Sequence, residues 1–127
     1  MDYGFTKEVN LPYEQAIEKI TEELKKEGFG ILTTIDVKDT LKKKIGVDFN
    51  RYIILGACNP NFAYQALQAE ENIGLLLPCN AIVYEKDGKT KVSLMNPEVM
   101  SAVSDSEKLN SIANQVGIIL RRVMDNV

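Results

Sequence analysis

Apolar and polar residues alternate at the start of the chain. This pattern predicts a first β-strand over residues 3–9, with Tyr3, Phe5 and Val9 on one side. Pro12 then opens a predicted helix, because proline fits the first helical turn without losing a hydrogen bond. The apolar side of that helix has members spaced four, three and four residues apart, namely Tyr13, Ile17, Ile20 and Leu24. Gly28 suits its C-terminal end.

The middle of the chain continues with strands and helices in turn. Residues 29–37 predict a second strand, one side of which is formed by Phe29, Ile31, Thr33, Ile35 and Val37. A short lysine-rich helix is predicted over residues 39–45, closed by Gly46. A strand over residues 51–57, a helix over residues 60–70 and a further strand after Ile73 follow.

The last third of the chain contains a hairpin and a long helix. Asp87-Gly88 is a tight-turn signal between two short apolar runs, so these runs are predicted to pair. A final helix is predicted from Ser104, whose spacing to Glu107 matches a capping box. Its apolar stripe consists of Leu109, Ile112, Val116, Leu120 and Val123.

This order of elements favours an α+β fold. Strands and helices are mixed irregularly and include a hairpin, which a doubly wound parallel sheet would not contain. A chain of 127 residues is long enough to bury its own core, and we expect one domain over residues 1–127. With 45% hydrophobic and 26% charged residues, the composition is that of an ordinary globular protein.

The composition also removes several classes of function. The chain has no histidine, which excludes Ser-His-Asp and Cys-His catalytic pairs and histidine-ligated zinc, so no catalytic centre is recognisable. The net charge of −3 disfavours nucleic-acid binding, and no apolar run approaches the length of a membrane span. The first residues lack the pattern of a signal peptide, so we expect a cytoplasmic protein with free thiols.

Both cysteines are followed by asparagine, and both Cys-Asn pairs lie where an apolar run breaks. Asn59 occupies a good N-cap position with Pro60 in the first helical turn, which places Cys58 just before a helix N-terminus. A thiolate is stabilised at such a position. Cys79 follows Pro78, and proline there argues for a strand edge or a bulge. We therefore expect the two sulfurs to lie near each other at one edge of the sheet.

Two interpretations of these segments remain open. The cysteines can be small buried packing residues, with the asparagines as a cap and a turn residue. Alternatively, they form a reactive or soft-metal-binding pair, in which two thiols hold Cu(I) and the asparagines line a polar pocket. Two cysteines cannot complete a tetrahedral zinc site within one chain, so no metal site is assigned.

These segments also carry a family resemblance. Residues 28–37 (GFGILTTIDV), 55–60 (LGACNP), 66–67 (AL) and 73–80 (IGLLLPCN) resemble the small bacterial and archaeal family known as domain of unknown function 302. The resemblance implies an α+β fold with a mostly antiparallel sheet and helices on one face, related in outline to the TATA-binding-protein-like fold and often found as a homodimer. It implies no established activity, so no catalytic residues are carried over.

From these observations we expect a small cytoplasmic binding or accessory module that works as a homodimer and takes a small-molecule or soft-metal ligand. Its candidate pocket is formed by Cys58, Asn59, Pro60, Cys79 and Asn80. One alternative is a thiol-based sulfur-, persulfide- or Cu(I)-handling protein using Cys58 and Cys79, and another is a dimeric scaffold with packing cysteines. The sequence names no cofactor.

The last helix supplies the argument from residues for a dimer. Ile118, Ile119 and Met124 widen its apolar face beyond the stripe that one core needs. We expect this surplus to leave exposed apolar surface that a second copy would bury. The competing view is that these residues fill the protein's own core.

Overall fold

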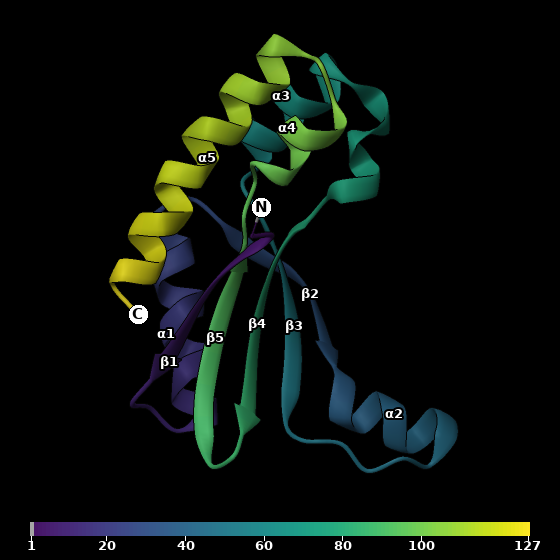
Figure 1. The fold of residues 1–127 in the computed structure, drawn as a ribbon, viewed down its shortest axis with the longest axis vertical. Coiled ribbons are helices and arrows are strands. Elements are labelled where there is room, and N and C mark those ends of the chain that lie inside the picture. The colour runs from purple at the N-terminus through teal and green to yellow at the C-terminus, as the bar shows by residue number, and fades with distance from the viewer. Residues whose placement is uncertain (1) are drawn as a thin grey trace.

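The computed structural model describes residues 2–127 and is built around a five-stranded sheet in the order β1-β5-β4-β3-β2 (Figure 1). Each neighbouring pair is antiparallel, which confirms the expected α+β fold. The strands are β1 (Gly4–Val9), β2 (Gly30–Asp36), β3 (Tyr52–Cys58), β4 (Cys79–Lys86) and β5 (Lys89–Met95). The helices are α1 (Tyr13–Lys26), α2 (Val37–Ile45), α3 (Pro60–Ala69), the 3₁₀ helix η1 (Glu71–Leu76), α4 (Val99–Val103) and α5 (Glu107–Asp125).

Helices α1 and α5 cover one face of the sheet, as Figure 1 shows, and the main core lies between them and the strands. Ile20 and Leu24 of α1 are fully buried there, as the helical spacing predicts. The strands contribute alternate residues to the same core, namely Leu55, Ala57, Ala81, Val83, Val92 and Leu94. The alternate residues on one face of the strands and the apolar stripes of the helices therefore pack together in one core layer.

A second, smaller core cluster lies beyond the end of the sheet. It joins α3, η1, α4 and the first half of α5 through Ala66, Ile73, Met100, Leu109 and Ala113. The strand predicted after Ile73 exists as β4, but it begins later than expected, at Cys79, because residues 71–76 form η1. Ile73 enters this cluster whereas Leu75 is 87% exposed. A short apolar run does not by itself distinguish a strand from a helical turn.

The alternation predicted for the second strand is interrupted by a β-bulge. Ile31 pairs with Ala57 and Thr33 pairs with Gly56, so Leu32 is an extra residue in β2. Ile31 therefore faces the core, while Thr33 and the residues paired after it are one position out of the predicted phase. An inserted residue of this kind leaves no mark on the pattern of residue types.

The start of α5 differs from the predicted capping box by two residues. Ser106 is the N-cap, and its hydroxyl accepts a hydrogen bond from the backbone N–H of Leu109 at 3.2 Å. Ser104 instead accepts from the backbone N–H of Ser106 at 3.2 Å. Both serines suit a cap, and the helix begins where Leu109 reaches the second core cluster.

The expected apolar surplus on α5 is absorbed by the protein's own core. Met124 is buried and Ile119 is partly buried against the main core, so the exposed patch is smaller than predicted. Ile118, at 57% exposure, is the exception. The helix needs a wide apolar face because it covers the sheet and extends over the second cluster.

The positions of Ile118 and Ile119 lead to a test of this arrangement. We expect Ile119→Lys to lower the free energy of unfolding by about 1–3 kcal/mol, since it removes a packed apolar side chain and brings a charge to the core edge. Ile118→Lys is the matched control and should change stability by less than about 0.5 kcal/mol. Urea unfolding followed by circular dichroism measures both, and equal costs would contradict the assignment.

Candidate functional site

The two cysteines lie at the same end of the sheet. Strands β3 and β4 are antiparallel neighbours, so the last residue of β3, Cys58, lies beside the first residue of β4, Cys79. The register pairs Ala57 directly with Cys79. Both thiols are free, and Cys58 is partly buried whereas Cys79 is buried. This end of the sheet is also where the main core meets the second cluster.

A small cavity occupies that junction. Cys58, Asn59 and Cys79 contribute to its wall, together with apolar side chains from both core clusters that include Phe29, Phe62, Met100 and Ile112. Its free volume for a water-sized molecule is about 30 Å³. That is the space of one methyl group or one sulfur atom, and far less than a drug-sized ligand needs.

The structure therefore brings together three of the five residues predicted for a pocket. Pro60 is exposed in the first turn of α3, and Asn80 is exposed beside Gly56 on the sheet's other face. Neither belongs to the cavity wall. Alternation along β4 explains Asn80, because Cys79 and Asn80 must point to opposite faces of the sheet.

Most of the cavity wall was not predicted from the sequence. Pro78 lies next to Cys79 and could have been included from its position alone. Met100 comes from α4, far along the chain, and only its apolar character hints at burial. Long-range packing of this kind has no local signature.

Asn59 acts as the N-cap of α3, as the sequence predicts. Its side-chain oxygen accepts from the backbone N–H groups of Asn61 at 3.1 Å and Phe62 at 3.3 Å. Its amide nitrogen donates to the backbone carbonyl of Glu27 at 3.5 Å. Because Asn59 already occupies these two N–H groups, they are not available to stabilise a Cys58 thiolate.

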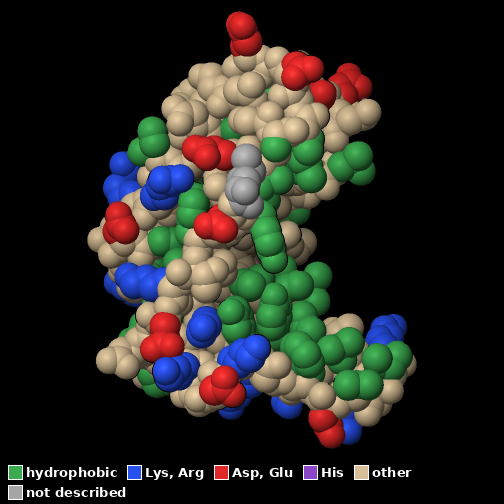
Figure 2. All heavy atoms as spheres, in the orientation of Figure 1, with side chains coloured by type: hydrophobic (Ala, Val, Ile, Leu, Met, Phe, Trp, Pro, Cys, Tyr) green, Lys and Arg blue, Asp and Glu red, His purple; other side chains and the backbone are tan. Residues whose placement is uncertain are grey.

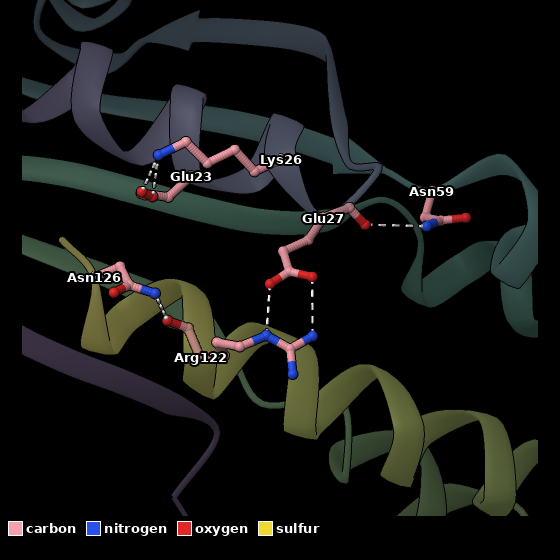
Figure 3. Close-up of polar contacts among 6 residues, drawn as sticks. All are labelled: Glu23, Lys26, Glu27, Asn59, Arg122 and Asn126. Atoms are coloured by element: carbon pink, nitrogen blue, oxygen red, sulfur yellow. Dashed lines mark hydrogen bonds and ion pairs between the residues drawn. The ribbon is translucent and has the colours of Figure 1, made fainter.

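Glu27 links three helices at the edge of the cavity, as Figure 3 shows. Its carboxylate accepts two hydrogen bonds from Arg122 of α5, at 2.6 and 2.9 Å, while its carbonyl meets Asn59. The Arg122 guanidinium lowers the pKa of the Glu27 carboxyl. Gly28 follows with φ +83°, and a Cβ there would lie 2.9 Å from the Asn59 amide nitrogen. Glycine thus serves both the left-handed turn and this close approach.

The two thiols differ in environment. Cys79 is only 8% exposed, and burial, followed by the nearby Cys58 sulfur, raises the pKa of Cys79 to about 11. Cys79 is therefore protonated at neutral pH and is a poor nucleophile. Across residues 2–127, no group of three or more His, Cys, Asp or Glu side chains is placed to hold a metal ion. The site can offer two sulfur ligands at most.

Comparison with known proteins agrees with this architecture. The family model described as "Domain of unknown function DUF302" matches residues 5–127. The chain belongs to this family. The resemblance drawn from the Cys-Asn segments is thereby confirmed.

A solved structure gives the same result in three dimensions. The crystal structure of an uncharacterized conserved DUF302 protein from Bacillus stearothermophilus is similar with a TM-score of 0.91 and 31% sequence identity. The similarity covers 99% of this chain and 98% of that one. None of the curated proteins matches the chain. In residues 2–127 we find no helix with the length and apolar character to cross a membrane.

The buried thiol predicts a specific dependence of stability on pH. A pKa raised from 9.0 to about 11 means that the folded state favours the protonated thiol. This contribution is fully present below pH 9 and is lost as the pH rises through 11. Between pH 8 and 10 the wild type should therefore lose about 1 kcal/mol more stability than Cys79→Ala.

Cys58→Ala is the control for that measurement, because it keeps the buried thiol and should still show the loss. The raised pKa of Tyr13, about 12, is common to all three proteins and cancels in the comparison. Urea unfolding at each pH provides the free energies. Identical pH profiles for the wild type and Cys79→Ala would contradict the assignment.

Proposed function

We propose that this protein is a small cytoplasmic binding module that works as a homodimer and holds one small apolar or sulfur-containing group of its ligand in the cavity at the Cys-Asn segments. The observation that carries the proposal is the cavity itself, to which Cys58, Asn59 and Cys79 all contribute. The two free thiols are in keeping with a reducing compartment.

The size and lining of the cavity define the ligand group. About 30 Å³ accommodates one methyl group or one sulfur atom but not an aromatic ring. The apolar side chains around it favour an uncharged group, and the partly buried Cys58 thiol and Asn59 amide add polar groups to the wall. The bulk of a larger ligand would remain outside.

Dimethyl sulfide is a suitable probe, because a single methyl group of it has the size that the cavity accommodates. We expect saturable shifts of the ¹³C-methyl signals of Met100 and Ile112 when it is titrated into the labelled protein. Ala63→Met, which places a side chain in the cavity, should weaken this binding at least tenfold. Ala102→Met, on the exposed side of α4, is the control and should bind like the wild type.

Two results would contradict the proposed binding site. One is the absence of saturable shifts in the wild type, and the other is equal affinity in Ala63→Met. Circular dichroism of both variants establishes that the fold is retained before the titrations are compared.

The shared cavity also supports a second candidate function. Cys58 and Cys79 both belong to the cavity wall, which makes their two thiols candidate ligands for a soft cation such as Cu(I). Binding would displace the proton that Cys79 retains at neutral pH, so the affinity should rise with pH. This candidate requires both thiols, whereas the apolar site requires neither.

Titration with Cu(I) against a chelating competitor separates the two candidates. If the thiols form the site, one Cu(I) binds per chain, and either Cys58→Ser or Cys79→Ser abolishes it. Retention of Cu(I) binding in either variant, or none in the wild type, rejects the thiol site. Failure of both the Cu(I) and the dimethyl sulfide titrations would leave the cysteines as packing residues of a scaffold.

A further inference from the structure

The face of the sheet opposite α1 and α5 forms a continuous uncharged surface. Five residues paired in register cross all five strands in one row: Thr6, Ser93, Ile82, Ile54 and Ile35. The hydroxyls of Thr6 and Ser93 bond to each other at 2.8 Å, so they satisfy each other within the row. Beside the row, the rings of Tyr52 and Tyr84 stack at 5.4 Å. We call these residues the open face.

Helix α2 continues this surface. Figure 2 shows hydrophobic side chains gathered from the middle of the sheet to α2, with a hollow between α2 and the upper part of the molecule. None of the nine residues of α2 (Val37–Ile45) is buried. Ile45 is 67% exposed, and Val47 and Phe49 in the following loop are also exposed. A helix this short gains little stability by itself, and α2 buries none of its own residues in one chain.

We propose that a second copy of this chain covers the open face, and that α2 with residues 45–49 of each copy packs against the partner. This inference rests on the proposed homodimer and names its interface. Two antiparallel sheets would then pack face to face about 10 Å apart, with the helices of each copy outside. The interface is isologous, so the same surface must complement itself.

The charge distribution favours a second copy over a charged partner. The row across the open face carries no charge, so two copies can meet there without like-charge repulsion. Beyond this row, Glu8 lies opposite Lys91 and forms an ion pair with Lys89 at 3.7 Å within one chain. Two of the four lysines of α2 form ion pairs, Lys42 with Asp48 and Lys43 with Asp39.

The available area indicates that α2 is part of the interface. Five strands about 4.8 Å apart and about seven residues long give a flat area of about 550 Å². A stable dimer buries about 800 Å² of accessible surface on each partner. The sheet alone falls short, and the apolar side of α2 and its loop is the adjoining surface that makes up the difference.

Sedimentation equilibrium between 1 and 100 μM tests the inference. We expect the wild type to sediment as a dimer of two 14.2 kDa chains. Ile54→Lys, in the middle of the open face, and Ile45→Glu, on α2, should each weaken the dimer at least tenfold. Ile118→Lys, exposed on α5 outside this surface, is the control and should remain dimeric.

The possible results distinguish a wrongly assigned interface from the absence of a dimer. A monomeric wild type would overturn the homodimer and this inference together. A dimer that resists both Ile54→Lys and Ile45→Glu would keep the homodimer and reject the open face as its interface. Ile45 is largely exposed in one chain, so Ile45→Glu decides the matter if Ile54→Lys fails to fold.

Discussion

A sheet has two faces, and within residues 2–127 the long helices cover one of them. This constraint sets the residue pattern of every strand. One set of alternate side chains fills the core beneath α1 and α5, and the other set faces away from it. Leu55, Val83 and Leu94 lie on the covered side and are almost completely buried. With that side filled by two helices, α3, η1 and α4 pack instead beyond the end of the sheet.

Helix α5 connects the two regions that result. Its 19 residues extend about 28 Å, so it reaches from the main core to the second cluster. The cavity lies at the junction, where the walls include the small side chains of Ala57, Ala63, Ala66 and Ala113. Small residues leave the space, and the Asn59–Glu27–Arg122 contacts hold α3, α1 and α5 at its margin. The site is therefore a consequence of how two cores adjoin.

The elements with a complete local signal were predictable from the sequence. The stripe of α1, the hairpin turn at Asp87-Gly88 and the Asn59 cap each depend on residues a few positions apart. The predictions that the structure corrects concern residues whose positions depend on contacts far apart in the sequence. Ile73 and Ile119 were recognised as apolar, but their partners in the second cluster and the main core were not visible locally.

The candidate site divides in the same way. The location of Cys58 and Cys79 at one end of the sheet follows from two adjacent strands, whereas Asn80 points to the other face because side chains alternate after Cys79. Met100 could not be placed at the cavity without knowing where α4 packs. Sequence patterns thus indicate the end of the sheet at which the cavity lies. Long-range packing determines which side chains enclose that cavity.

The bulge at Leu32 has a consequence for the length of this chain. Ile31 and Thr33 already pair with consecutive residues of β3. Loss of Leu32 would therefore leave all the remaining side chains of β2 on their present faces. Loss of any neighbouring residue in a regular stretch would invert all that follow. The bulge also bends its strand, and β2 leads directly into α2. Shortening the chain at this one residue would preserve the core and the cavity while changing the direction in which α2 leaves the sheet.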